Sequence, residues 1–174
     1  MCNFTYDISK THTSIILSIV DGVNCKLYLE LGVFTGINIH EIRKVCNNCI
    51  GVDIYDQLIH NDFEMHTTST DNFFKTFNKN PDVIFIDADH IVEQVKKDFK
   101  NSLNCLNKNG VIILHDTDPY TKEFLSSEYC GDSYKMHDWI KENYPELNII
   151  TLPIGFTGLT IVNRNNDRRV LNFL

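Results

Sequence analysis

The stretch Lys26-Leu-Tyr-Leu-Glu30-Leu-Gly32-Val-Phe-Thr35-Gly36 decides the fold of this 174-residue chain. Its first half is an apolar run that ends at a glycine, which is typical of a short buried strand. Its second half is a glycine-containing loop that leads into a helical pattern at 37–45, and a second apolar run follows at 49–54. The stretch therefore predicts a strand, a tight turn and a helix, followed by a second strand, which is a βαβ unit.

The same alternation continues to the end of the chain. We expect strands at 26–31, 49–54, 63–67, 83–86, 111–114, 148–152 and 157–163, and helices at 10–21, 37–45, 92–106 and 133–143, with Phe73, Phe74 and Phe77 also at helical spacing. Short apolar strands that alternate with amphipathic helices predict an α/β domain with a largely parallel sheet and helices on both sides. We interpret 1–174 as one doubly wound domain, with an N-terminal helical segment at 1–25 and a core at 26–163.

Composition limits the kind of partner. With 43% hydrophobic residues, the chain can bury a core without disulfides, and six scattered cysteines fit reduced thiols. A net charge of −7 attracts neither phosphate backbones nor anionic lipid, so we expect no nucleic acid or membrane partner. The apolar run at 14–20 is too short to span a bilayer and lacks the features of a secretory signal, so we expect a cytoplasmic protein.

Polar residues follow the strands at the edge where doubly wound sheets bind ligands. They are Glu30, Gly32 and Gly36 after the first strand, Asp53 and Asp56 after the second, Asp87, Asp89 and His90 after the fourth, and His115, Asp116 and Thr117 after the fifth. Asp53 stands about 20 positions after Gly32, the spacing of a carboxylate that holds ribose hydroxyls. The two features favour an adenosine-bearing cofactor, although Asp53 could instead cap the next turn.

The groups that end the fourth and fifth strands are candidates for catalysis. If these strands are neighbours, carboxylates and imidazoles meet in one pocket, where they could orient or deprotonate a hydroxyl or hold a divalent cation. Asp116 or Thr117 could alternatively shape the turn before Pro119. The remaining histidines have no such context and are assigned to the surface or to supporting positions: His12, His40, His60, His66 and His137.

Five motifs, taken in order, suggest a family. They are Glu30-Leu-Gly32-Val-Phe-Thr35-Gly36, Gly51-Val-Asp53, Thr68-Ser69-Thr70-Asp71-Asn-Phe73-Phe74, Ile84-Phe-Ile-Asp87-Ala-Asp89-His90 and Gly110-Val-Ile-Ile-Leu-His115-Asp116-Thr117. Over about 26–163 the chain resembles the class I S-adenosylmethionine (SAM) methyltransferases, and more narrowly a bacterial branch whose signatures read IDGDH and HDT. The resemblance implies a Rossmann-like, mostly parallel seven-stranded sheet with an antiparallel last strand.

The resemblance also implies roles for individual residues. Cofactor contacts are expected from Glu30, Gly32, Thr35, Gly36, Asp53, Ser69, Thr70 and Asp87, with Asp53 on the ribose and Ser69 or Thr70 beside the adenine. Related catechol-type enzymes bind Mg²⁺ at the ends of strands four and five, which corresponds here to Asp87, His115 and Asp116. His115 stands where those enzymes have a carboxylate. For catalysis we expect His90 or His115 as the base, with Asp116 orienting it or binding metal.

The predicted reaction is methyl transfer from SAM to a small molecule, most simply O-methylation of a small or sugar-type acceptor. Two alternatives stay open. One is a SAM-binding module without activity. The other is a glycosyltransferase that uses Asp87-Ala-Asp89 as a metal-binding DXD motif. The loop at 118–132 carries Tyr120, Phe124 and Tyr129 and either covers the pocket or packs against the sheet. The oligomeric state stays open, with a homodimer as one option.

Overall fold

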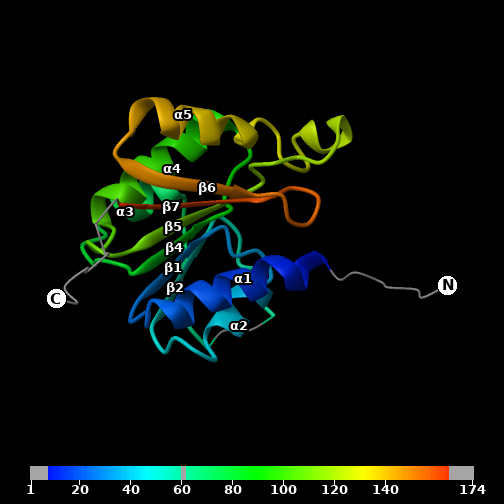
Figure 1. Ribbon diagram of the computed structural model, residues 1–174. Coiled ribbons are helices and arrows are strands. Elements are labelled where there is room, and N and C mark those ends of the chain that lie inside the picture. Colours follow the sequence, from blue (N-terminus) through cyan, green and yellow to red (C-terminus); the bar gives the residue numbers. More distant parts are fainter. Residues whose placement is uncertain (1–7, 60–61, 165–174) are drawn as a thin grey trace.

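The computed structural model describes residues 8–59 and 62–164, which build a seven-stranded sheet between two layers of helices (Figure 1). The strands are β1 (Tyr28–Leu31), β2 (Cys49–Asp53), β3 (Glu64–Thr67), β4 (Val83–Ile86), β5 (Val111–His115), β6 (Leu147–Leu152) and β7 (Leu159–Arg164). Their order is β3-β2-β1-β4-β5-β7-β6, and β7 runs antiparallel to both of its neighbours. The predicted fold, including the antiparallel last strand, is confirmed.

The helices are α1 (Ile8–Gly22), α2 (Ile37–Ile42), α3 (Thr70–Phe74), α4 (Val92–Cys105) and α5 (Met136–Asn143), with 3₁₀ turns η1 (Lys122–Leu125) and η2 (Ser133–Lys135). In Figure 1, α1 and α2 cover one face of the sheet and α3, α4 and α5 the other. Two predicted helices are shorter than expected. The end of the 37–45 helix and the start of the 133–143 helix form i to i−3 hydrogen bonds, which are common at helix ends.

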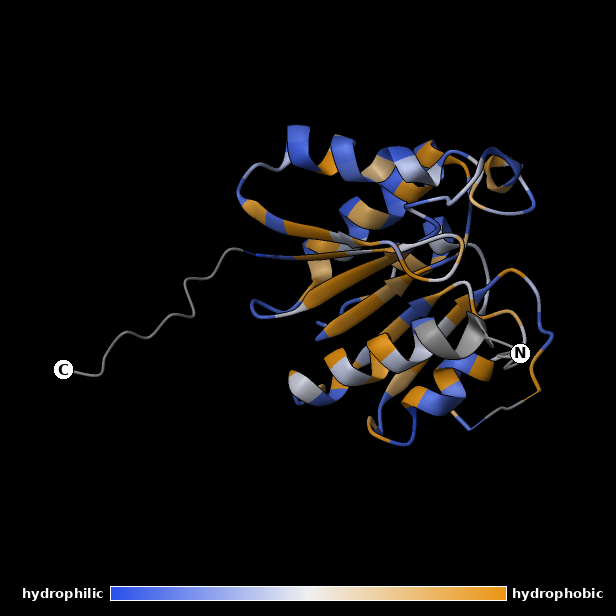
Figure 2. Ribbon diagram, turned by 45° about the vertical axis from the view of Figure 1, so that its right-hand side comes forward, coloured by the Kyte–Doolittle hydropathy of each residue, from blue (hydrophilic) through white to orange (hydrophobic). Residues whose placement is uncertain are grey.

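The core lies on both faces of the sheet because the central strands are buried on both sides. All four residues of β1 and of β4 are buried, as expected for strands covered by helices. Figure 2 shows the largely hydrophobic sheet between the two layers of helices. Phe99 of α4 is fully buried and contacts Trp139 of α5 edge to face. The edge strand β6 instead alternates, with Ile150 exposed. The central strands therefore form a rigid support for the loops at their carboxyl ends.

The strand order reverses between β1 and β4, so the loops after these two strands diverge and leave a crevice. Gly32 directly follows β1 and has a φ of 86°. A Cβ atom there would lie 2.2 Å from the carbonyl oxygen of Asp87, so only glycine fits this crossing. The loops after β5 and before β7 are joined by backbone bonds, from Asp118 N to Thr157 O and from Tyr120 N to Phe156 O.

Two other expectations concern cysteines and membranes. The cysteines of the described ranges are free thiols, and three of them, Cys25, Cys46 and Cys49, are buried at the opposite end of the sheet. Cys2 lies outside the described residues. Among residues 8–59 and 62–164, no helix combines the length and apolar character needed to cross a membrane.

Candidate active site

Two cavities lie side by side at the carboxyl ends of the strands. The larger, of about 770 Å³, is lined by residues from α1, α2, η1, the loops after β1, β4 and β5, and the loop before β7. The smaller, of about 200 Å³, lies between the ends of β2 and β3 and the start of α4. Gly32, Asp53 and Ala88 line both, so the cavities meet where the strand order reverses.

Most of the predicted site residues line these cavities. Glu30, Gly32, Thr35, Asp53, Asp87, His90, His115 and Asp116 line the larger one, and Ser69 and Thr70 line the smaller one together with Gly32 and Asp53. Gly36 lines neither cavity: it has a φ of 80° and forms the N-terminal cap of α2. Its position in the motif reflects a backbone turn, which the sequence alone could not separate from a ligand contact.

Asp53 holds the loop that follows β1. Its Oδ2 accepts hydrogen bonds of 2.8 Å from the backbone N–H of both Val33 and Phe34, and its Oδ1 accepts one from Tyr55 N. This is the turn-stabilising role that the sequence left open. Phe34 has a φ of 51°, in the left-handed region that a bulky residue rarely adopts, and Asp53 fixes that geometry. Because Asp53 also lines both cavities, one carboxylate shapes the loop and faces the ligand space.

Glu30 is a buried carboxyl at the end of β1. Its Oε2 accepts hydrogen bonds from the Tyr28 hydroxyl at 2.6 Å and from the Asn38 amide at 2.5 Å. Burial raises the pKa of Glu30 to about 8, against the opposing effect of these two bonds. The side-chain oxygen of Asn38 is buried without a hydrogen-bond partner in the described chain. A carboxyl with this pKa is mostly protonated at neutral pH in the ligand-free protein, and a ligand with N–H donors or positive charge would favour its ionised form.

His115 joins the carboxylates that follow β4 and β5. Its Nδ1 lies 3.0 Å from Asp87 Oδ1 and 3.1 Å from Asp116 Oδ1. Burial lowers the pKa of His115, but the two carboxylates outweigh burial and raise it to about 10. The ring is therefore an imidazolium at neutral pH, and both of its nitrogens are donors.

His12 of α1 completes this network. His115 Nε2 lies 2.8 Å from His12 Nδ1, and the two rings meet edge to face at 4.3 Å. Burial and the neighbouring His115 lower the pKa of His12, so His12 is neutral and accepts this bond. The sequence gives no signal for this contact because His12 lies 103 positions before His115, on a helix that precedes every motif. His60 lies outside the described residues.

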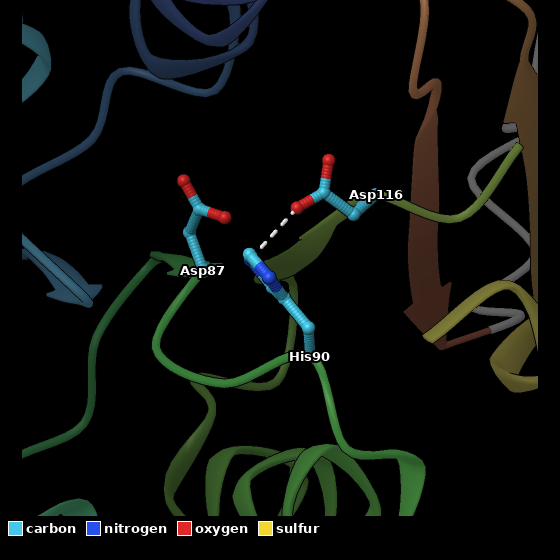
Figure 3. A group of neighbouring side chains, drawn as sticks. All are labelled: Asp87, His90 and Asp116. Atoms are coloured by element: carbon cyan, nitrogen blue, oxygen red, sulfur yellow. Dashed lines mark ion pairs between the residues drawn. The ribbon is translucent and has the colours of Figure 1, made fainter. Parts of the chain in front are cut away.

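Asp116 is also paired with His90, as Figure 3 shows. His90 Nε2 lies 3.0 Å from Asp116 Oδ2. The hydrogen bond with Asp116 raises the pKa of His90 above its usual 6.5. Burial would raise the pKa of Asp116, but His115 and His90 together hold it far below its usual range. Asp116 has a φ of 60°, so a strained backbone presents this carboxylate to both rings.

One group of side chains in the described ranges has metal-ligand spacing: the ligand atoms of Asp87, His90 and Asp116 lie within 4.8 Å of one another. The predicted set contained His115 in place of His90. His115 instead contacts both carboxylates through Nδ1 and His12 through Nε2. Two carboxylates and an imidazole suit a transition metal better than Mg²⁺, which prefers oxygen ligands.

Comparison with known proteins decides the family. A family model described as a methyltransferase domain matches residues 29–117, just over half of the chain. The chain belongs to the SAM-dependent methyltransferase family. A search of curated proteins found no match to this methyltransferase.

Solved structures share its fold. An O-methyltransferase from Bacillus cereus, in complex with SAH, is 15% identical with a TM-score of 0.74, covering 92% of this chain and 83% of that one. The O-methyltransferase TomG from Streptomyces achromogenes, in complex with SAM, is 12% identical with a TM-score of 0.69, covering 90% and 80%. The N-methyltransferase NodS from Bradyrhizobium japonicum is 11% identical with a TM-score of 0.63, covering 91% and 96%. The fold therefore serves both oxygen and nitrogen acceptors.

Proposed function

We propose that this methyltransferase transfers the methyl group of SAM to a hydroxyl of a small-molecule acceptor. The observation that carries the proposal is the pairing of Asp116 with two imidazoles inside the larger cavity. Such a cluster can remove a proton, which an oxygen nucleophile requires before or during methylation. The Bacillus cereus and Streptomyces achromogenes structures, which are O-methyltransferases with bound SAH or SAM, support the same reaction.

The residues present fit SAM. The sulfonium supplies a reactive methyl group, so the protein has to bind the cofactor and the acceptor, orient them and exclude water. Glu30 and the unpaired oxygen of Asn38 suit the cationic methionine part. Gly32 lets the ligand approach the backbone, and Asp53 offers a carboxylate to the ribose hydroxyls. Ser69 and Thr70, at the smaller cavity, suit the adenine.

His90 is the better candidate for the base. His115 donates from both nitrogens and has no lone pair with which to accept a proton. We assign it the task of holding the carboxylates of Asp87 and Asp116 in place. His90 is paired with Asp116 alone among the carboxylates, and once neutral it can take the proton of an acceptor hydroxyl. Turnover should therefore rise with pH through a pKa above the usual 6.5 of histidine.

A divalent cation could use the same groups. Asp87, His90 and Asp116 would hold it, and a bound metal would polarise the acceptor oxygen. Metal and proton then compete for His90, because its Nε2 faces Asp116 in either case. An experiment can separate the two uses, since a chelator abolishes a reaction that depends on the metal and leaves one in which His90 acts as the base.

Aromatic side chains around the cavity favour an acceptor with a flat face. Phe124 and Phe156 stack with ring centroids 5.4 Å apart, and Tyr129 meets Phe124 edge to face at 5.2 Å. All three line the larger cavity. Aromatic rings bind planar aromatic compounds, and they bind sugar rings through their apolar faces. Phe124 and Tyr129 therefore favour the first of the two alternatives for the loop at 118–132, that it covers the pocket, whereas Tyr120 of the same loop does not line the cavity.

The glycosyltransferase alternative is not supported. A DXD motif needs both carboxylates on one metal, but Asp87 lines the larger cavity and Asp89 the smaller. Asp89 Oδ1 accepts a hydrogen bond from Ile91 N at 2.8 Å, which uses this carboxylate to shape the start of α4. The match to a methyltransferase family gives no support for sugar-nucleotide chemistry.

The test is calorimetric titration of the full chain with SAM and SAH. We expect micromolar-range binding, weakened at least ten-fold by Asp53→Ala, because the loop after β1 loses its anchor. Asp138→Ala, an exposed carboxylate on α5, serves as the matched control and should bind like the wild type. Binding followed by turnover on a panel of hydroxylated aromatics and sugars supports the proposal. A comparison of turnover with and without EDTA shows whether the reaction needs a metal. No binding of SAM or SAH would refute it, and binding without turnover would favour the inactive module.

A further inference from the structure

Three cysteines lie close together at the end of the sheet opposite the candidate active site. Cys25 lies just before β1, Cys46 lies in the turn between α2 and β2, and Cys49 is the first residue of β2. Cys46 Sγ lies 3.9 Å from Cys25 Sγ, and the Cys49 thiol donates a hydrogen bond of 3.3 Å to the carbonyl oxygen of Cys46. All three side chains are buried, and the proposed methyl transfer uses none of them. The cluster is therefore a candidate for a separate chemistry.

The arrangement of the sulfurs favours a disulfide over a metal site. Within residues 8–59 and 62–164, the side chains that have metal-ligand spacing lie at the other end of the sheet, and the three thiols are not among them. A disulfide needs only two sulfurs, and its S–S bond is about 2.05 Å long, so Cys25 and Cys46 have to approach by about 2 Å. Cys46 lies in a turn whose neighbouring residues Val45 and Asn47 are exposed, so this segment can supply the movement at little cost in packing.

Cys46 is the nucleophile of the pair. The thiols of Cys25 and Cys49 donate to its sulfur, which lowers the pKa of Cys46, and the same contact raises the pKa of Cys25. Cysteine reacts with oxidants as the thiolate, so Cys46 reacts first and Cys25 second. The residues that follow Cys46 line a surface groove of about 680 Å³: they are Asn47, Asn48 and Cys49. A small oxidant therefore has only the wall of this groove to pass.

We propose that Cys25 and Cys46 form a reversible disulfide when a peroxide reaches this end of the molecule. The Cys46 thiolate attacks one oxygen of hydrogen peroxide, the O–O bond breaks, and a sulfenic acid forms together with a hydroxide ion that takes up a proton. Cys25 then gives up its proton and attacks the Cys46 sulfur, the S–O bond breaks, and water leaves. In total the two thiols lose two electrons, and the peroxide is reduced to two molecules of water. This redox site does not depend on the proposed use of SAM.

The disulfide would link elements that support the active-site loops. Cys25 and Cys46 are 21 positions apart, and the segment between them contains β1, the turn from Gly32 to Gly36, and α2. A disulfide stabilises a protein mainly because it restricts the unfolded chain, so the oxidised protein should melt about 5 to 10 °C above the reduced one.

The experiment treats the folded full chain with a small excess of hydrogen peroxide, alkylates the remaining thiols after denaturation, and maps the peptides by mass spectrometry. We expect one intramolecular disulfide between Cys25 and Cys46, which dithiothreitol reverses, together with the rise in Tm. Cys46→Ala should lose both the disulfide and the rise. Cys105→Ala, which removes a half-buried thiol on α4 that contacts the backbone of Ser102, is the matched control and should keep both. Cys49→Ala should keep both as well.

Several outcomes would overturn the inference. One is a folded protein in which Cys25 and Cys46 both stay reduced, and another is a disulfide between Cys46 and Cys49 in place of the expected one. A link between Cys25 and Cys46 that forms only in urea would also overturn it, as would oxidation of Cys46 to a sulfinic acid without a disulfide. If Cys46→Ala does not fold by circular dichroism, Cys25→Ala replaces it, with the same expected loss.

Discussion

The two cavities treat acidic side chains in opposite ways. In the larger cavity, Asp87 and Asp116 are paired with the imidazoles of His115 and His90. In the smaller cavity, Asp98 is buried with one oxygen unpaired. Carboxylates that are paired with imidazoles keep their charge, and such pairs can exchange protons. A buried acceptor without a partner is instead stabilised when a donor reaches it. The difference distinguishes the proposed proton-transfer cluster from an acceptor-rich part of the same crevice, and the predictions below test these assignments.

The largest effect is expected from Asp116→Asn. The change removes the negative charge that orients His90 and balances His115, so neither imidazole keeps its protonation state. Loss of a positioned general base typically costs a factor of about 10² to 10⁴ in rate. We expect turnover on the best acceptor of the panel to fall by about that factor, while SAH affinity changes by less than about three-fold, because Asp116 pairs with His90 and His115 and not with Glu30, Asn38 or Asp53, the residues assigned to SAM.

Asn38→Ser, on the cofactor-facing wall, is the converse variant for this comparison. It should weaken SAH binding and leave the rate at saturating SAM nearly unchanged. Equal losses of binding and rate in both variants would show that the Asp116 side and the Asn38 side of the larger cavity do not have separate roles.

A second prediction concerns His115 and the pH dependence of stability. The folded-state pKa of His115, about 10, lies above its usual value of 6.5. The ion pair therefore contributes its full stabilisation below about pH 6.5, and this contribution is lost as the pH rises through 10. Breaking a buried pair costs about 3 to 5 kcal/mol, so His115→Gln should be destabilised by about that amount at pH 6.5 and by much less at pH 10.

Urea unfolding of both proteins at the two pH values, in the presence of a chelator, measures this difference. His66→Gln is the matched control, since His66 forms an exposed ion pair with Glu64. A constant difference between wild type and His115→Gln across the pH range would mean that the buried ring is neutral.

How far the sequence predicts these features depends on how local they are. Strands, helices and the loop from Glu30 to Gly36 follow from apolar runs and glycine spacing, and the carboxyl-edge rule brings Asp87 and Asp116 together. The sequence does not predict the role of His12, because its contact with His115 depends on how α1 packs against the sheet, which no local pattern encodes. The burial of Asp98 is not predicted for a related reason. It is a charged residue of an amphipathic helix, and only the fold reveals that it is buried.

Asp98 provides the third prediction, on the smaller cavity. Its pKa is raised from 3.8 to about 6, so the folded state is penalised once the pH exceeds the unfolded value, and the penalty is complete above about pH 6. Asp98→Asn should therefore stabilise the ligand-free protein by about 2 kcal/mol at pH 8 and by about 1 kcal/mol less at pH 5. Urea unfolding at both values checks this. A destabilised variant at pH 8 would indicate that Asp98 is satisfied within the protein.

The smallest effect concerns Phe34, on the loop between the cavities. It has a φ of 51°, its ring is 68% exposed, and its backbone N–H is held by Asp53. Glycine adopts this geometry freely, whereas any residue with a Cβ pays about 1 kcal/mol or more. Removal of an exposed ring costs little, so the comparison of Phe34→Gly with Phe34→Ala isolates the backbone. We expect the glycine variant to be the more stable by up to about 1 kcal/mol in thermal melts, because the entropy of its unfolded chain offsets part of the gain. An alanine variant as stable as the glycine variant would mean that Asp53 does not hold the loop in the left-handed form in solution, and the shared wall of the two cavities would then be mobile.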